Sequence, residues 1–166
     1  LGPTAGGGAY GPALTDVVVL APEGRIFVTG PDVVKSVTGE NVDMAKLGGP
    51  EAHKKNSGLA HIIADSEEEA FEDIRKLASL FANQGHINVK LDGVDLSKFV
   101  PDSRKRVYEV HPLVEELLDH DESMDLLADW APNMLTAIGR LGGRTVGVIA
   151  NNPKHLGGVL DAAAGE

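Results

Sequence analysis

Four small residues near the start of the chain, Ala5-Gly6-Gly7-Gly8, could do chemistry through their backbone. Three successive glycines leave the peptide N–H groups at a helix start unobstructed by side chains. Such groups can stabilise an oxyanion, and the helix dipole adds to the effect. Glycine clusters also occur where only a tight turn or close helix packing is needed. The pattern by itself favours this structural role and leaves the catalytic role open.

The side chains carry few catalytic signatures. There is no Gly-x-Ser-x-Gly nucleophile elbow, and the glycine cluster has neither the Gly-Lys-Ser/Thr of a phosphate-binding loop nor the spacing of a dinucleotide fingerprint. Ser57 and His61 are close in sequence, but no third residue orients them, which disfavours a nucleophilic serine. The six histidines are scattered, without an i, i+4 pair beside an acidic residue, so we expect no metal site.

Composition narrows the class of protein. A hydrophobic share of 42% and a charged share of 24% are ordinary for a soluble globular chain. No stretch approaches the ~20 apolar residues that span a bilayer. The formal charge of -10 argues against a nucleic-acid binder, because neutralising phosphates needs clustered Lys and Arg. The absence of cysteine excludes disulfides and Cys-ligated zinc and fits a reducing compartment. Together, these observations lead us to expect a cytoplasmic protein without membrane or nucleic-acid partners.

The elements that must position the glycine cluster are short strands and helices. Apolar runs predict strands at residues 17–20, 25–28 and 59–64, and the small residues 8–14 allow a short helix. Pro31 and Gly39 are typical of the first residue of a helix and of its end. The spacing of Ser66 and Glu69 is that of a capping box, which predicts a helix running to about residue 83. Its apolar face would carry Ala70, Ile74, Leu77, Ala78 and Phe81.

The second half of the chain repeats this alternation after a break. Residues 85–107 are polar and show no sustained period, which is typical of an interdomain linker. Residues 112–120 predict a short helix, and residues 134–139 and 144–150 predict two strands joined by a glycine turn. The inward side of that helix would carry Val114, Leu117 and Leu118. Because strands and helices alternate on both sides of the break, we expect an α/β fold.

Short motifs run through the chain in a characteristic order. They occupy residues 2–16, 27–40, 47–50, 57–61, 130–133, 142–153 and 157–161. Together they resemble the carboxyltransferase β subunits of biotin-dependent acyl-CoA carboxylases, of the acetyl-CoA and propionyl-CoA carboxylase type. The first motif is similar to that family's Gly-Pro-Cys-Ala-Gly-Gly segment, with Thr4 in place of the cysteine. This exchange of cysteine for threonine matters little if the backbone N–H groups, and not the side chain, act in catalysis.

The resemblance implies a crotonase-like fold of β-β-α superhelical units, with parts of two domains. Residues 1–84 would be the C-terminal part of the N-terminal domain, residues 85–107 the linker, and residues 108–166 the start of the C-terminal domain. Leu1 in place of Met also suggests an internal piece of a longer subunit. In the family the active site forms between two subunits, so the resemblance implies a homo-oligomer, a hexamer, and little activity for this piece alone.

The reaction implied by the resemblance moves a carboxyl group from carboxybiotin to acetyl-CoA or propionyl-CoA. The products would be malonyl-CoA or methylmalonyl-CoA, for fatty-acid and lipid synthesis. Biotin would be carried on a partner α subunit that combines biotin carboxylase and biotin carrier functions. Two alternatives remain. A biotin-dependent acyl-CoA decarboxylase subunit would share the fold, and a non-catalytic module could bind CoA or serve assembly.

By motif position, Gly6 and Gly7 are the candidates for the oxyanion hole of the acyl-CoA, through their backbone N–H groups. Ala5 and Gly8 would lie beside them against the substrate. The loss of one such donor typically costs about 3 kcal/mol of transition-state stabilisation.

Two further groups of residues are implied less directly. Gly30 and Pro31 would line the thioester side of the pocket, or they would only start a helix. Asn151, Asn152 and Pro153 would approach biotin, or they would only form a turn.

Overall fold

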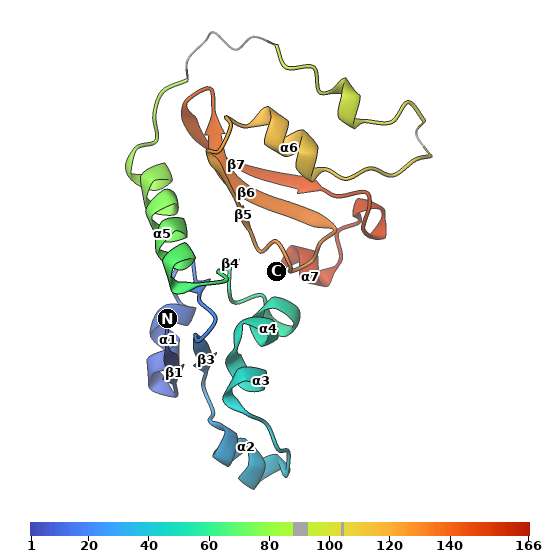
Figure 1. Ribbon diagram of the computed structural model, residues 1–166. Helices are drawn as coiled ribbons and strands as arrows, with labels where there is room; N and C mark the ends of the chain where they lie inside the picture. Colours follow the sequence, from blue (N-terminus) through green and yellow to red (C-terminus); the bar gives the residue numbers. More distant parts are fainter. Residues whose placement is uncertain (88–92, 104) are drawn as a thin grey trace. The chain divides into compact units, whose positions relative to one another are not determined.

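The chain forms two compact units, Leu1–Arg75 and Lys76–Glu166, in a computed structural model that describes residues 1–87, 93–103 and 105–166 (Figure 1). The boundary between the units falls within helix α5 (Glu67–Ala82). Each unit has its own strands and its own buried apolar clusters.

The first unit is built on two pairs of short parallel strands. Strand β1 (Pro3–Ala5) pairs with β3 (Arg25–Phe27), and β2 (Val19–Leu20) pairs with β4 (Ile62–Ile63). All three strands predicted for this half are confirmed, although each is shorter than expected. Strand β1 was not predicted, because a Pro-Thr-Ala stretch carries no apolar alternation.

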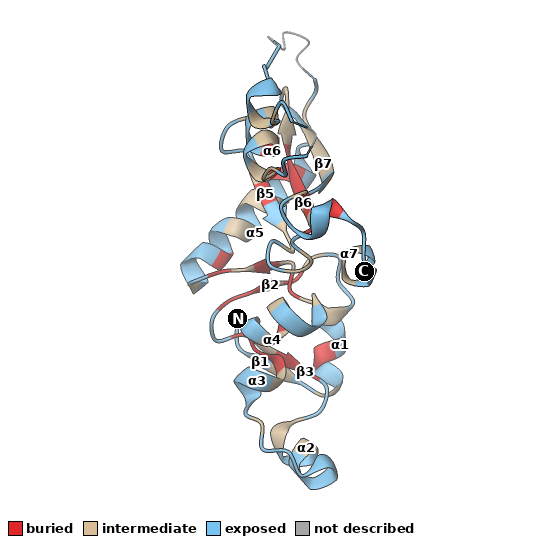
Figure 2. Cartoon of the chain, turned by 90° about the vertical axis from the view of Figure 1, so that its right-hand side faces the viewer, coloured by how far each residue is buried: buried red, intermediate tan, exposed pale blue. Residues whose placement is uncertain are grey.

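The core of the first unit lies between these strands and helix α1 (Gly7–Ala13). In Figure 2 the buried residues of this unit, drawn in red, gather on the strands and on the inner side of α1. Small residues on α1 let the helix approach the strands closely. The core cluster consists of Ala9, Val18, Leu20, Ile26 and Ala60, with Leu59 and Ile63 packed against it.

Short helices follow β3. Helix α2 (Pro31–Thr38) begins at its proline and ends at Gly39 in the left-handed conformation, as predicted, but buries no residue. Helix α3 (Met44–Gly48) is capped by Asp43, whose carboxylate accepts the Lys46 N–H at 2.7 Å. Helix α4 (Pro50–Ala52) runs into a π-helical turn, η1 (His53–Ser57). We did not predict α3, α4 or η1, because each is too short to show a hydrophobic period.

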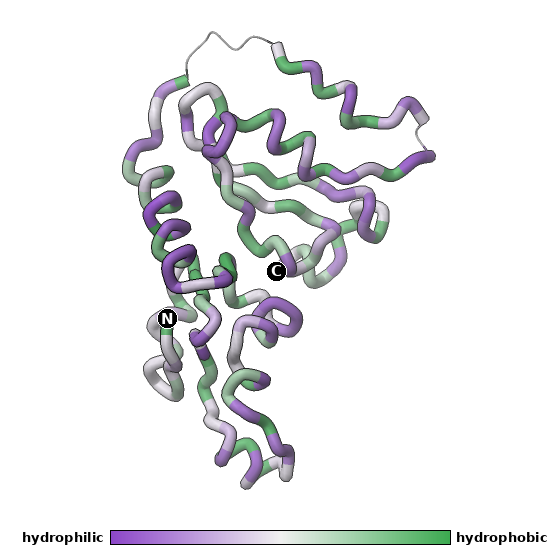
Figure 3. The backbone as a smooth tube through the Cα atoms, in the orientation of Figure 1, coloured by the Kyte–Doolittle hydropathy of each residue, from purple (hydrophilic) through white to green (hydrophobic). Residues whose placement is uncertain are grey.

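Helix α5 has the predicted N-terminus. The Glu69 N–H donates to Ser66 Oγ at 3.0 Å, while the Glu69 carboxylate accepts the Asp65 N–H at 2.7 Å, one residue earlier than in a standard capping box. Its burial differs from the prediction: Ile74 and Phe81 are 44% and 56% exposed. Figure 3 shows hydrophilic and hydrophobic residues mixed along the helix.

The burial of α5 differs from the predicted apolar face because the two units bury different residues of the helix. Near its start, Ala70 packs with Ala21 and Ala64 of the first unit. Near its end, Leu80 is fully buried within the second unit. A single stripe calculated over the whole helix therefore describes neither contact.

The second unit is an antiparallel sheet of three strands, β5 (Ser123–Leu126), β6 (Met134–Leu141) and β7 (Arg144–Asn151), with β6 in the centre. Helix α6 (His111–Leu117) packs on one face of the sheet (Figure 1). The helix and the two predicted strands are confirmed, whereas β5 was not predicted. The core consists of Val110, Val114, Leu118, Leu135 and Ala137, while Leu117 is only half-buried.

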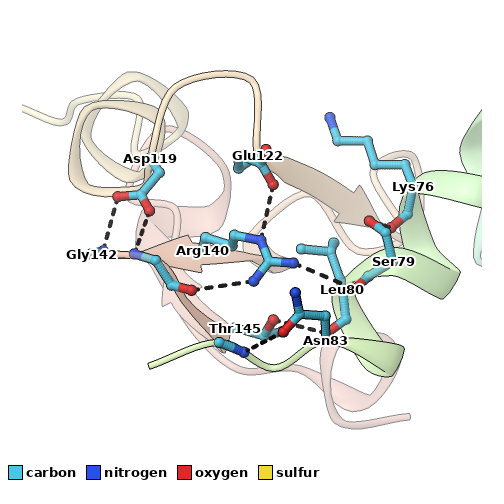
Figure 4. A network of polar contacts seen from close by, with 11 residues as sticks. Lys76, Ser79, Leu80, Asn83, Asp119, Glu122, Arg140, Gly142 and Thr145 are labelled. Atoms are coloured by element: carbon cyan, nitrogen blue, oxygen red, sulfur yellow. Dashed lines mark hydrogen bonds and ion pairs between the residues drawn. The ribbon is translucent and has the colours of Figure 1, made fainter. Parts of the chain in front are cut away.

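The turn between β6 and β7 has two residues, Gly142 and Gly143, both with positive φ (59° and 85°). This is the geometry of a type I′ turn, whose twist matches that of the flanking strands. The Asp119 carboxylate accepts the Gly142 N–H at 2.9 Å and the Gly143 N–H at 2.7 Å (Figure 4). The end of α6 is thereby tied to the hairpin.

The same hairpin binds the C-terminal turn of α5. Thr145 Oγ1 donates to the Leu80 carbonyl at 2.8 Å, and the Arg140 guanidinium donates to the Ser79 carbonyl at 3.4 Å (Figure 4). Arg140 also pairs with Glu122 at 3.0 Å. The Ser79 carbonyl also accepts the Asn83 N–H at 3.1 Å, so the Arg140 bond is an additional one at this helix end. These contacts explain why the second unit begins at Lys76, before the residue 84 at which we divided the sequence.

Candidate active site

The glycine cluster forms the turn between β1 and α1. Gly6 has φ 58° and ψ -133°, a conformation that residues with a Cβ rarely adopt, and it caps α1. Its N–H donates to the Phe27 carbonyl at 3.1 Å, which continues the β1–β3 pairing beyond Ala5. In this structure the Gly6 N–H is used in the strand ladder, and its role as an oxyanion donor stays a prediction.

The next two glycines are the available donors. Within the described part of the chain, neither the Gly7 N–H nor the Gly8 N–H has a hydrogen-bond partner, and both residues are exposed. They occupy the first turn of α1, where backbone N–H groups lack an intrahelical acceptor. A Cβ on Gly7 would meet nothing within 4 Å, whereas one on Gly8 would lie 3.0 Å from Thr4 Oγ1.

An apolar cavity of about 470 Å³ lies against α1 and the end of β3. Gly30 and Pro31 begin α2 as predicted, and residues on either side of them, Thr29 and Val34, line the cavity. Its size and apolar walls with a few polar groups are typical of small-molecule sites. The walls are formed by Ala9, Tyr10, Ala13, Ile26, Phe27, Val28, Thr29, Val34, Leu47, His53, Ser57 and Leu59.

The partner of Ser57 in this cavity is His53, and not His61. Ser57 Oγ lies 2.8 Å from His53 Nδ1, and His53 Nε2 lies 2.9 Å from the Ile26 carbonyl oxygen. His61 instead accepts the Val18 N–H at 3.2 Å. Sequence reasoning missed His53, although its i, i+4 spacing from Ser57 was a usable signal. Its other partner, Ile26, could not be read from local sequence.

The predicted biotin-side residues are held within the second unit. Asn151 Nδ2 donates to the Gly158 carbonyl at 2.5 Å. Asn152 is 1% exposed, and its Nδ2 donates to Glu109 at 2.6 Å. Both side-chain amides thus have partners that hold the loop in place. The Asn152 side chain is buried, whereas Asn151 is exposed and its bond to Gly158 leaves the amide oxygen available to a ligand.

Glu109 is the centre of a polar cluster in this unit. It accepts from His111 Nδ1 at 2.8 Å, and Lys154 Nζ lies 3.5 Å from its other oxygen. The hydrogen bond from His111, followed by the one from Asn152, lowers the pKa of Glu109 from 4.5 to about 2, against the opposing effect of burial. His111 Nε2 also lies 3.2 Å from Asp125. The cluster ties the start of α6 to β5 and to the loop after β7.

The described residues contain neither a cluster of metal-ligating side chains nor a helix that could span a membrane. No three His, Asp or Glu side chains lie close enough together to hold a metal ion. No helix in the described ranges combines the length and apolarity needed to cross a bilayer.

Comparison with known protein families identifies the family of the chain that carries this cavity and glycine turn. The model of the carboxyl transferase domain matches residues 1–166, the whole chain. The chain belongs to the carboxyl transferase family. The chain is 55% identical over 170 residues to the biotin-dependent acetyl-/propionyl-coenzyme A carboxylase beta6 subunit of Mycobacterium tuberculosis. It is 54% identical over 164 residues to the propionyl-CoA carboxylase beta chain of Rhodococcus erythropolis.

These relatives are longer than the carboxyl transferase chain. The match covers 100% of the chain and 36% of the mycobacterial subunit, and 95% of the chain and 34% of the Rhodococcus protein. Among solved structures, the transcarboxylase 12S hexamer with hydrolysed methylmalonyl-coenzyme A bound matches with a TM-score of 0.88. It is 36% identical, and the match covers 98% of this chain and 34% of that one. The chain therefore has the expected crotonase-like fold.

Proposed function

We propose that this carboxyl transferase chain carries the acyl-thioester part of a site that moves a carboxyl group from carboxybiotin to the α-carbon of acetyl-CoA or propionyl-CoA. One observation carries the proposal. Two adjacent N–H groups, those of Gly7 and Gly8, stand unpaired among the described residues at the start of α1, and the same helix forms a wall of the apolar cavity. Ala5, which ends β1, precedes this turn.

The two N–H groups act on the thioester oxygen. Removing the α-proton of an acyl thioester gives an enolate, whose negative charge rests on that oxygen. Donors that are fixed before the reaction stabilise this charge without reorganising, and losing one typically lowers the rate roughly 100- to 1,000-fold. The Gly6–Phe27 bond and the positive φ of Gly6 hold the turn in place.

Biotin supplies the carboxyl group and, once freed, a base for the α-proton. We propose that it is carried on a partner α subunit with biotin carboxylase and biotin carrier functions. The Asn152 side chain is buried and bonded to Glu109, so we limit the proposed biotin contact to the backbone of residues 151–153, the exposed Asn151 side chain and the Pro153 ring.

The proposed organisation follows the family. Residues 1–84 would belong to the N-terminal and residues 108–166 to the C-terminal carboxyltransferase domain, joined by the linker 85–107. The presence of two compact units supports a division into two domains, although the units meet at Arg75 and Lys76. Assembly as a homo-hexamer, with the complete site formed between subunits, is supported by the hexamer of transcarboxylase 12S. Malonyl-CoA or methylmalonyl-CoA made there would feed fatty-acid synthesis.

The test uses the natural full-length protein with its biotinylated partner, ATP and labelled bicarbonate. We expect label in malonyl-CoA or methylmalonyl-CoA. A complex that binds acyl-CoA but incorporates no label from bicarbonate into either product would refute the proposal. Release of CO2 from malonyl-CoA or methylmalonyl-CoA without any net carboxylation would instead identify a decarboxylase.

A further inference from the structure

The imidazole of His53 bridges a cavity wall and a strand. On one side its Nδ1 lies 2.8 Å from Ser57 Oγ, and on the other its Nε2 lies 2.9 Å from the Ile26 carbonyl oxygen. His53 is 7% exposed, whereas Ser57 is exposed, and both line the 470 Å³ cavity. The two residues belong to the π-helical turn η1, a type of turn that is frequent at functional sites.

The two bonds determine which way the protons point. A backbone carbonyl only accepts hydrogen bonds, so Nε2 must carry the proton that is shared with Ile26. In neutral imidazole the other nitrogen, Nδ1, is then an acceptor. The Ser57 hydroxyl must therefore donate its single proton to His53.

Ser57 consequently faces the cavity as an acceptor only. A hydroxyl has one donor proton and two acceptor lone pairs. Ser57 donates this proton to His53 Nδ1, and the Leu59 N–H donates to one of the Ser57 lone pairs at 3.3 Å. One lone pair remains. It can accept an N–H group, but it cannot serve a thioester carbonyl, which is itself an acceptor.

We propose that Ser57 is a recognition residue that accepts a hydrogen bond from an acylated N–H group of the ligand in this cavity. The inference rests on the proposed function, which brings two ligands with such a group to the site. One source is a secondary amide in the pantetheine arm of acyl-CoA, and the other is the ureido ring of biotin. In either case the group is an N–H in an otherwise apolar setting, which matches a wall that is mostly apolar.

If His53 and Ser57 had only a structural role, they would connect η1 to β3 without contacting the ligand. The test therefore measures specificity, which a structural role does not change. Two probes form a matched pair: S-propionyl-N-acetylcysteamine, and the analogue in which an ester oxygen replaces its amide N–H. Dissociation constants are measured by ligand-observed NMR on the natural full-length protein. We expect the wild type to prefer the amide roughly tenfold, the value of one hydrogen bond.

Three variants sharpen the measurement. Ser57→Ala should reduce the preference to about one, since a single hydrogen bond carries it. Ser57→Thr keeps the hydroxyl and should keep the preference, so it shows that the site survives substitution. Ser36→Ala, the same change on α2 outside the cavity, should leave the preference unchanged.

The biotin source is tested in parallel with free biotin. A loss of biotin binding in Ser57→Ala, with no amide preference in the wild type, assigns the N–H group to the ureido ring. If Ser57→Ala changes neither the amide preference nor biotin binding, the inference is overturned. That outcome is separate from a failure of the proposed function, which is measured by carboxylation and not by probe preference.

Discussion

The backbone N–H of Gly6 donates to the Phe27 carbonyl oxygen at 3.1 Å. This bond extends the pairing of β1 with β3 by one residue and sets the point at which the chain turns into α1. The Gly6 N–H is therefore engaged in the strand ladder, while no partner of the Gly7 and Gly8 N–H groups lies among the described residues. We accordingly propose a conformational role for Gly6 and a donor role for Gly7 and Gly8.

Gly6→Ala should destabilise the protein. The φ of 58° with a ψ of -133° is strained for any residue with a Cβ, by on the order of 1–3 kcal/mol. Urea denaturation should show the midpoint shifted down, with activity reduced as the turn distorts. An unchanged midpoint would mean that the turn adapts and that this backbone geometry is not required.

Gly7→Val should abolish carboxyl transfer while leaving stability nearly unchanged. A Cβ added at this position meets nothing within 4 Å, so we expect the side chain to obstruct the ligand and not the fold. We expect turnover to fall roughly 100- to 1,000-fold, as for the loss of an oxyanion donor.

The matched control for this variant is Gly11→Val. Gly11 lies in the same helix, and its Cβ likewise meets nothing within 4 Å, but it follows the first turn. It should keep turnover within a few-fold. Equal activity of the two variants would remove Gly7 from the mechanism.

Asp119→Ala should weaken the second unit by about 1–2 kcal/mol, because two N–H groups of the hairpin turn lose a charged acceptor. Asp119→Asn keeps one acceptor oxygen and should lose about half as much. Both variants can be compared by chemical denaturation, with far-UV circular dichroism as the probe. Identical stability of all three proteins would show that water replaces the carboxylate without penalty.

The Glu109 cluster should make stability depend on pH in acid. The pKa of Glu109 is lowered to about 2 in the folded protein, from 4.5. Because the folded state holds this proton more weakly than the unfolded state, the stabilisation is complete above pH 4.5. It is lost progressively as the pH falls towards 2.

Glu109→Gln removes this titration. The variant should be less stable than the wild type at neutral pH, and the difference should shrink between pH 4.5 and 2. Denaturation midpoints measured at several pH values test this. Parallel pH profiles for the two proteins would exclude the cluster as the source of the dependence.

Much of the fold was accessible from local patterns. We predicted helix α2, the N-terminus of α5, helix α6 and the β6–β7 hairpin. Each has a local start or stop signal in its own sequence, namely proline, glycine or a capping box. Strands β1 and β5 and the turn η1 were missed. Their residues have no local period, and they take these conformations because of partners elsewhere in the chain, as β1 does with β3.

The candidate site likewise has features that local sequence predicts and features that only folding determines. The glycine turn at Gly6–Gly8 could be found from sequence, because glycine itself signals exposed amides. The choice of donors could not, since the Phe27 carbonyl that occupies the Gly6 N–H comes from a strand that follows later in the chain. His53 and Ser57 were likewise joined to Ile26 only by folding.

The sequence by itself determined that this chain is an α/β member of the carboxyl transferase family, since residue order and motif spacing carry the family. Tertiary structure decided which amides are free, which histidine holds Ser57 and how α5 is shared between the two units. The physical reason is that a hydrogen bond or an apolar contact depends on distance in space. Distances between residues far apart in the chain are set only when strands pair and helices pack.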